Sequence, residues 1–225
     1  MICYYFCSPM NDEVNIPIHI PYEELIREEL KKELPGSEAQ YKMAPGLRLK
    51  SRSGTSVKKA AVLILLYPKG KSLYTVFIRR PKYFGIHSGQ ISLPGGKMEQ
   101  NDTDVAVTAL REAEEELGIN RQDVKILGQL SPLLIPVSNM LVYPVVGFIA
   151  DKPIFHPQQF EVAELIETAI EEFLRPGVIQ DKIEMIRLTR AVVPFYNIRG
   201  HHIWGATAMI MSEFTELLRR IESHR

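Results

Sequence analysis

The residues best suited to chemistry form an acidic helix that follows a pair of glycines. The sequence predicts a helix over residues 102–117, ended by Gly118, because glycine is favoured just after a last helical turn. At 100° per residue, Glu112, Glu115 and Glu116 fall within an arc of roughly 100° on this helix. Carboxylates spaced in this way repel one another, and carboxylate oxygens are the ligands that Mg²⁺ prefers. The spacing therefore indicates a site for a divalent cation.

The glycine pair lies a few residues before the helix. Gly95 and Gly96 follow Pro94, and glycine allows positive φ angles and a close approach of the backbone to a ligand. Such a turn is able to place backbone carbonyl or N–H groups beside the carboxylates. Arg111 stands one helical turn before Glu115 and is placed to orient its side chain.

Each feature taken alone has a simpler interpretation. An acidic run such as residues 112–116 is typical of a solvated helix face, and Pro-Gly-Gly is typical of an ordinary turn. Glu114 points to the other side of the helix, where we expect it to be solvated. The two features at this spacing, together with the Arg-Glu pair, are far more specific than either. An apolar stripe anchors the same helix: Ala106, Ala109, Leu110, Ala113 and Leu117.

These residues resemble the Nudix box, whose pattern is G-x5-E-x7-R-E-U-x-E-E-x-G-U with U aliphatic. Gly96 opens the box, and residues 111–119 (REAEEELGI) match its second half with Ala as the first U. The first half departs from the pattern. Asp102 stands where the first Glu is expected, and one residue is inserted between it and Arg111.

The insertion resembles the branch of the family that includes coenzyme A pyrophosphatases, whose boxes read GGK-x-D-x-x-D followed by TALREAEEE. Residues 95–102 (GGKMEQND) and 108–118 (TALREAEEELG) are close to that form. Residues 87–92 (HSGQIS) run into LPGG as the branch's HxGQ segment runs into FPGG, and residues 203–208 (IWGATA) resemble its IWG-x-TA segment. The resemblance covers about residues 57–218.

The upstream coenzyme A signature is only partly kept. It expects LLTxR, then Ser or Ala, a second Arg, a Gly and FPGG, whereas residues 76–80 read VFIRR and Gly85 replaces the second Arg. Arg80 is kept. A guanidinium at position 85 would hold a phosphate by charge-assisted hydrogen bonds, and Arg79 or Lys82 is a candidate to make this phosphate contact instead. The resemblance to this branch makes coenzyme A the leading substrate.

The resemblance implies an α+β fold, the Nudix α/β/α sandwich with a mixed sheet and a loop-helix-loop catalytic motif. It also implies an enzyme dependent on Mg²⁺ (or Mn²⁺). Glu112 and Glu116 would be the principal metal ligands and Glu115 a third, and the metal would activate the attacking water. One of these glutamates, or a distal carboxylate such as Glu161 or Glu164, would accept the proton of the water.

The implied reaction is hydrolysis of a diphosphate linked to a nucleoside. For coenzyme A the products would be phosphopantetheine and adenosine 3′,5′-bisphosphate. The implied catalytic residues are Arg111, Glu112, Glu115 and Glu116. The candidate substrate-binding residues are Arg79, Arg80, His87, Gly95 and Gly96. Two alternatives remain: hydrolysis of another nucleoside diphosphate derivative, such as ADP-ribose or a dinucleotide, and a non-catalytic fold that senses a nucleotide. Because all three box glutamates are present, the second alternative is disfavoured.

Composition bounds the class of protein. The chain has 225 residues, 45% of them hydrophobic and 24% charged, with a formal net charge of zero. It therefore has no global basic field for binding nucleic acid. Cys3 and Cys7 are its two cysteines, which provide no disulfide framework. No apolar run reaches the roughly 18 residues of a membrane span, and no basic segment marks a signal peptide. We expect a cytoplasmic protein with a small nucleotide substrate as its partner, without nucleic acid or membrane.

The order of predicted elements shows no regular alternation of strand and helix, which favours α+β. We divide the chain into an N-terminal extension, residues 1–55, and a catalytic domain, residues 56–225. The extension carries an amphipathic helix over residues 21–34, stopped by Pro35-Gly36, which is a candidate interface for a homodimer. The expected elements of the domain are strands at 57–67, 72–80, 91–93, within 124–135, 140–150 and 183–198, and helices at 102–117, 168–174 and 205–221.

Overall fold

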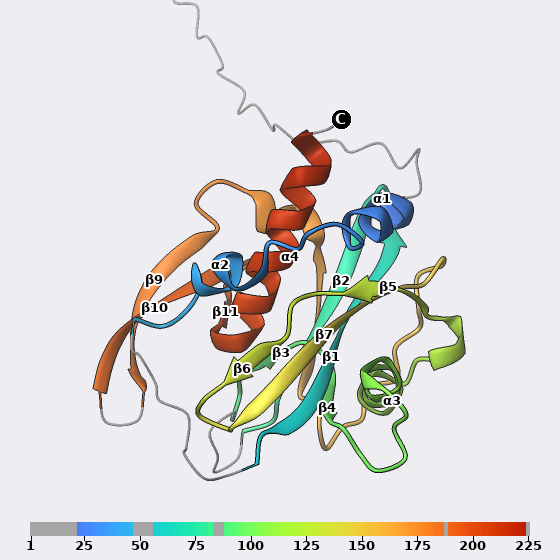
Figure 1. The fold of residues 1–225 in the computed structure, drawn as a ribbon, viewed down its shortest axis with the longest axis horizontal. Coiled ribbons are helices and arrows are strands. Elements are labelled where there is room, and N and C mark those ends of the chain that lie inside the picture. The colour runs from blue at the N-terminus through green and yellow to red at the C-terminus, as the bar shows by residue number, and fades with distance from the viewer. Residues whose placement is uncertain (1–21, 47–55, 83–87, 187–188, 224–225) are drawn as a thin grey trace, which may run out of the picture.

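A mixed β-sheet forms the centre of the molecule (Figure 1). The computed structural model describes residues 22–46, 56–82, 88–186 and 189–223. The main sheet has the order β3-β2-β1-β7-β5, with β4 pairing with β1, β6 with β7 and β8 with β2. Strands β1 and β7 run parallel and the other pairs antiparallel. The main-sheet strands are β1 (Lys58–Lys69), β2 (Ser72–Arg79), β3 (Ile91–Ser92), β4 (Gly95–Lys97), β5 (Lys125–Gln129), β6 (Leu133–Ile135), β7 (Met140–Phe148) and β8 (Glu164–Ala169).

Helices cover both faces of this sheet, which confirms the predicted α+β sandwich. Figure 1 shows α3 on one side of the sheet and α4 with α1 and α2 on the other. A second, antiparallel sheet has the order β11-β10-β9. The remaining elements are α1 (Tyr22–Glu29), α2 (Gly36–Tyr41), α3 (Val105–Leu117), α4 (Gly205–Ser223), the 3₁₀ helices η1 (Arg121–Asp123) and η2 (Ile170–Leu174), and the strands β9 (Ile179–Ile186), β10 (Thr189–Ile198) and β11 (His201–Trp204).

Strand β1 divides the hydrophobic interior into two cores. Successive side chains of a strand point to opposite faces. Ile64 and Leu66 accordingly pack with the apolar side chains of α4, while Leu63 and Leu65 pack with those of α3. All four are fully buried. Such a continuous apolar run is typical of a strand covered on both faces, so β1 fixes the position of α3, which carries the acidic box.

The described part of the N-terminal extension, residues 22–46, contains two helices where the sequence predicted one. Helix α1 ends at Glu29, short of the predicted residue 34, and Pro35 and Gly36 begin α2 instead of only stopping a helix. The buried carboxylate of Glu213 on α4 accepts hydrogen bonds from the Gly36 N–H (3.1 Å) and from Gln40 Nε2 (2.8 Å). The described part of the extension therefore packs into the same core as α4. The boundary at residue 55 and the homodimer stay predictions.

Two segments differ from the sequence prediction because pairing with distant strands decides them. Residues 168–174 were expected as a helix. Instead, β8 pairs antiparallel with β2 from Glu164 to Ala169, and only Ile170–Leu174 forms a 3₁₀ turn. The glycine pair belongs to strand β4, which pairs with β1, and is not a simple turn. No helix of the described ranges is long and apolar enough to cross a membrane, and the cytoplasmic location stays a prediction.

Candidate active site

Helix α3 is fixed at both ends by capping groups. Asp104 Oδ1 accepts hydrogen bonds from the N–H groups of Ala106 (2.8 Å) and Val107 (3.0 Å), as expected of an N-cap aspartate. The helix therefore begins at Val105, three residues later than predicted. Gly118 ends it in the left-handed conformation at φ 66°, as the sequence predicted. Burial of the apolar stripe then sets which face of α3 turns toward β4.

Glu116 points from this helix into the protein, toward the glycine strand. Its residue exposure is only 2%. One carboxylate oxygen accepts a hydrogen bond from the Gly95 N–H at 2.8 Å, and the other lies 3.8 Å from Arg80 Nη2. Burial raises the pKa of Glu116 to about 7, against the opposing effects of the Gly95 N–H and Arg80. The negative charge of Glu112 raises this pKa further.

Glu112 lies beside Glu116 and against the second glycine. A Cβ atom on Gly96 would overlap the Glu112 carboxylate, so this approach requires glycine. Burial raises the pKa of Glu112, and the neighbouring Arg111 opposes that shift. Gly95 adopts φ 152°, and a Cβ there would overlap the backbone of Ala61. Both glycines therefore serve close packing of backbone and carboxylate.

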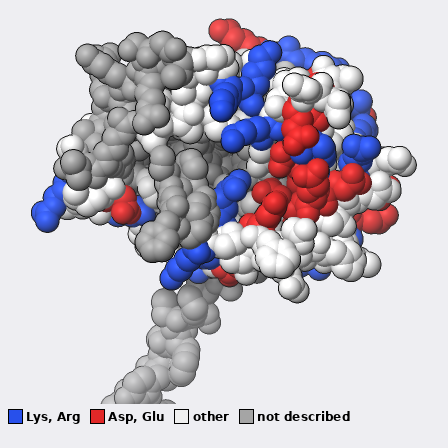
Figure 2. All heavy atoms as spheres, turned by 90° about the horizontal axis from the view of Figure 1, so that it is seen from below, with Lys and Arg blue, Asp and Glu red and all other residues white. Residues whose placement is uncertain are grey.

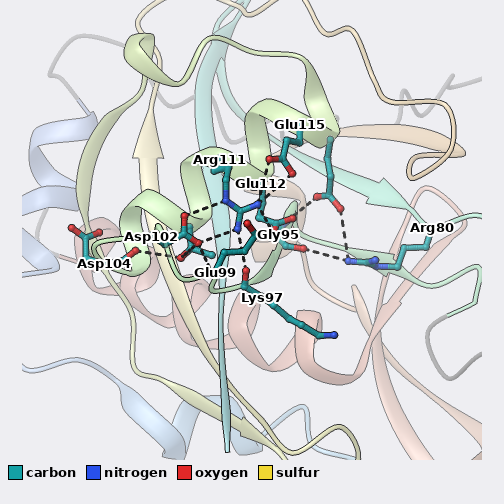
Figure 3. Close-up of polar contacts among 11 residues, drawn as sticks. Arg80, Gly95, Lys97, Glu99, Asp102, Asp104, Arg111, Glu112 and Glu115 are labelled. Carbon is teal, nitrogen blue, oxygen red and sulfur yellow. Dashed lines mark hydrogen bonds and ion pairs between the residues drawn. The ribbon is translucent and has the colours of Figure 1, made fainter.

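Arg111 holds the segment before α3 against the helix (Figure 3). Its guanidinium donates to both carboxylate oxygens of Asp102, at 3.1 and 3.0 Å, and to the Lys97 carbonyl at 3.0 Å. Its Nη1 lies 3.0 Å from a Glu112 oxygen and 3.3 Å from both Glu115 oxygens. The predicted contact between Arg111 and Glu115 is confirmed. Arg111 thus positions two of the box glutamates.

Asp102 is the partner of Arg111 that the sequence analysis did not assign. It is buried, and also accepts hydrogen bonds from Thr108 Oγ1 (3.0 Å) and the Glu99 N–H (2.8 Å). The hydrogen bonds from Arg111 lower the pKa of Asp102 to about 2. The sequence feature that could have identified this role is the position of Asp102 in the box, where the first acidic residue is expected. Its carboxylate holds the arginine, so it is a positioning residue.

The structure brings together two of the three predicted metal ligands. Glu112 and Glu116 both line one cleft, whereas the Glu115 side chain is 53% exposed, pairs with Arg111 and does not line it. Across the described ranges, no three His, Cys, Asp or Glu side chains form a metal-binding group. The pair still fits a divalent cation, because it combines carboxylate oxygens with raised pKa values, and a cation would compensate their negative charge. The ligand set, Glu115 included, stays a prediction.

The cleft has a volume of about 1850 Å³. Gly95, Gly96, Arg80 and the carboxylates of Glu112 and Glu116 line one end of it. On the face of the molecule in Figure 2, acidic side chains gather in one patch with Lys and Arg side chains around it. The cleft exceeds the roughly 300–1,000 Å³ typical of small-ligand pockets, so it has room for a substrate much longer than a diphosphate.

The other predicted residues divide between this cleft and other places. Glu161 lines the cleft, but Glu164 pairs with Arg79 at 2.6 Å. Arg79 also contacts His201 Nδ1 at 2.8 Å and lines a smaller pocket, which shares Gln90 and Trp204 with the cleft. Its role in substrate binding stays a prediction. His87 lies outside the described residues.

Comparison with known proteins decides the family. The profile of the NUDIX domain matches residues 57–188, more than half of the chain. The chain belongs to the Nudix family. Nudix hydrolases act on acid anhydrides in small nucleotide substrates and generally use divalent metal ions. The predicted family, fold and enzyme class are therefore confirmed.

Two Nudix proteins resemble this chain in sequence, and one solved Nudix structure resembles it in fold. The chain is 37% identical over 161 residues to the Nudix hydrolase NudL of Photorhabdus laumondii, covering 71% of this chain and 84% of that protein. It is 36% identical over 130 residues to the mouse peroxisomal coenzyme A diphosphatase NUDT7, covering 58% of this chain and 55% of that protein. The crystal structure of the Nudix hydrolase RenU from M. smegmatis superposes with a TM-score of 0.51 at 15% identity, over 77% of this chain and 94% of RenU. This last likeness supports the fold alone.

Proposed function

We propose that this Nudix hydrolase cleaves the diphosphate bond of coenzyme A or its derivatives, yielding phosphopantetheine and adenosine 3′,5′-bisphosphate. The observation that carries the proposal is that the carboxylates of Glu112 and Glu116 line the same end of a large cleft. Gly95, Gly96 and Arg80 line that end as well. The relative named as a coenzyme A diphosphatase supports the choice of substrate.

In this proposal the two glutamates hold Mg²⁺ or Mn²⁺, which, when bound, neutralises diphosphate charge and favours ionisation of water. Arg80 Nη2 lies within 3.4 Å of the Gly95 carbonyl, at the same end of the cleft, and its cation attracts a phosphate oxygen. Arg111, fixed by Asp102, keeps Glu112 oriented. These residues act by binding and positioning.

Glu161 is our candidate for the general base. It lines the cleft, and its charge raises the pKa of both Glu112 and Glu116, so it stands near the reacting end. The water oxygen forms a bond to one phosphorus while its proton passes to Glu161. The bond from that phosphorus to the bridging oxygen breaks, and the leaving phosphate keeps the electron pair. Glu164, held by Arg79, is the weaker candidate.

A second substrate class has one feature in its favour. Gly85 stands where the coenzyme A signature has its second Arg, and the loss of a phosphate contact there favours another nucleoside diphosphate, such as ADP-ribose or a dinucleotide. Product analysis by chromatography, with coenzyme A, ADP-ribose and a dinucleoside polyphosphate as substrates in Mg²⁺, separates the two. We expect coenzyme A to give the highest kcat/KM. A higher value for ADP-ribose would reject coenzyme A.

The catalytic assignment is tested by Glu116→Gln, with Glu114→Gln as a matched control on the same helix. Glu114 faces away from the cleft and lies 3.6 Å from Arg121. Loss of a metal ligand removes several kcal/mol of transition-state stabilisation, so we expect kcat to fall by about 100-fold or more in Glu116→Gln. We expect little change in the control. An unchanged kcat in a folded Glu116→Gln protein would exclude Glu116 from the metal site.

A further inference from the structure

The cleft is divided by charge along its length. At the end near α3 and β4 it is lined by charged side chains: Arg80, Lys97, Glu99, Glu112, Glu116 and Glu161. The opposite end is lined by α2 and the segment after it, by β6 with the loop that follows, and by the start of α4. Among the described residues of that end, none carries a charge. A ligand that fills both ends is therefore a diphosphate joined to an uncharged group.

The uncharged end combines β6 and its following loop, which lie inside the matched domain, with two parts of the chain outside it. Residues 41–46 precede the stretch 57–188 that matches the NUDIX profile, and α4 follows it. The short segment after α2 is held in place at several points. Met43 is buried with 1% exposure, and the Gly46 N–H donates to the Val192 carbonyl at 3.1 Å. Ser212 Oγ on α4 donates to the Ala39 carbonyl at 2.7 Å. The wall is thus a fixed part of the fold.

Large apolar side chains of this wall remain accessible. Tyr41 is 62% exposed and Leu134 is 41% exposed, and both line the cleft. Met209 and Ile210 on α4, both buried, line the same cleft. Accessible apolar side chains gathered in a concave site mark a ligand-binding surface. The surface is continuous with the carboxylate end, so one ligand reaches both.

We propose that the wall formed by residues 41–46, β6 and the start of α4 binds an uncharged, predominantly apolar chain attached to the diphosphate, and that it sets the substrate preference of the enzyme. This inference uses the proposed function only in placing the diphosphate at the carboxylate end. Sugars and second nucleotides present hydroxyl or charged groups that need polar partners when buried. At this end the Thr207 hydroxyl already donates to the Ile91 carbonyl at 3.2 Å, and the Ser138 hydroxyl oxygen is buried below the cleft surface. An apolar chain has no such requirement.

The experiment compares kcat/KM for two series of substrates with Mg²⁺. One series is coenzyme A and its acetyl, hexanoyl and decanoyl thioesters. The other is a set of ADP esters carrying butyl or octyl chains, which contain no pantetheine. Burying one methylene favours binding by up to about fourfold, so we expect octyl-ADP to exceed butyl-ADP by about tenfold or more. A ratio below about two would overturn the inference.

Variants locate the effect. Leu134→Glu places a charge in the wall, and Tyr41→Ala removes apolar surface from it. We expect each to reduce the octyl-to-butyl ratio at least about threefold. Ile183→Glu is the matched control, because Ile183 is 73% exposed on β9 and does not line the cleft. Circular dichroism and thermal unfolding establish that each variant is folded.

The outcomes separate this inference from the proposed substrate. If coenzyme A is not hydrolysed but the ADP esters show the chain-length preference, the coenzyme A proposal fails and the wall proposal holds. If coenzyme A is hydrolysed but chain length has no effect, only the wall proposal fails. An equal reduction of the ratio by Leu134→Glu and Ile183→Glu would also overturn the wall proposal.

Discussion

The carboxylate of Glu116 accepts a hydrogen bond from the backbone N–H of Gly95 at 2.8 Å, which joins the last turn of α3 to strand β4. This contact keeps a buried carboxylate at the end of the cleft. Burial nonetheless raises the pKa of Glu116 to about 7 from an ordinary 4.5, so ionisation of the side chain destabilises the metal-free fold. An enzyme often accepts such a cost at its active site.

We therefore predict that Glu116→Gln stabilises the metal-free protein while it impairs catalysis. The raised pKa means that the folded state binds the proton more tightly than the unfolded state. The cost to the wild type is then absent below pH about 4.5, grows between pH 4.5 and 7, and is complete above pH 7. At pH 8 we expect a gain of up to about 3 kcal/mol in the free energy of unfolding.

Urea unfolding in EDTA at pH 5 and pH 8 measures this difference. We expect the gain from Glu116→Gln to be much smaller at pH 5, where the wild-type side chain is largely protonated when folded. The Glu114→Gln variant serves as the control at both pH values. A gain that does not depend on pH would contradict the assigned cause.

Metal binding is predicted to act in the opposite sense to this cost. Because a cation binds the folded state alone, it stabilises that state by mass action, about 2.7 kcal/mol at 100 times its Kd. We expect Mg²⁺ or Mn²⁺ to raise the Tm of the wild type, and EDTA to abolish hydrolysis. Differential scanning fluorimetry of Glu112→Gln and Glu116→Gln should show this shift reduced or lost. If the metal raised the Tm of both variants as much as that of the wild type, the metal site would lie elsewhere.

The pair of Asp102 and Arg111 predicts a response of stability to acid. The pKa of Asp102 is lowered from 3.8 to about 2 by the Arg111 hydrogen bonds, so its contribution is complete above pH about 4 and is lost as the pH falls toward 2. Asp102→Asn should cost about 1–3 kcal/mol at pH 7, because it weakens charge-assisted hydrogen bonds. Urea unfolding should show the difference from wild type shrinking as the pH is lowered below 4. A constant difference would contradict the role assigned to the ionised carboxylate.

The two glycines of β4 are predicted to respond differently to alanine. At Gly96 the added Cβ meets the Glu112 carboxylate, a side chain that is able to move. We therefore expect Gly96→Ala to lower kcat with little change in Tm. At Gly95 the Cβ meets the backbone of Ala61 and Val62, which is fixed in the sheet, so Gly95→Ala should lower the Tm markedly. Thermal unfolding and kinetics on both variants make the comparison, and the reverse order of Tm losses would contradict it.

Much of the box was determined by local sequence. The apolar stripe and the Gly118 cap were enough to predict α3, because helix periodicity and left-handed capping are local properties. The same periodicity predicted Glu112 and Glu116 on one arc and Arg111 beside Glu115. The long apolar run that became β1, and the strand after it that became β2, were likewise predicted from neighbouring residues.

Tertiary structure decided which of these side chains are buried and what they face. The spacing alone did not separate Glu115, exposed beside Arg111, from Glu116, buried against Gly95, because packing of the apolar stripe on the sheet sets the rotation of α3. Strand β8 exists because β2 supplies its hydrogen-bond partners across more than eighty residues of sequence. In the same way, the wall around Tyr41 depends on α4, which lies at the other end of the chain. Contacts between segments so far apart leave no periodic signal in the sequence, and only the folded chain brings them together.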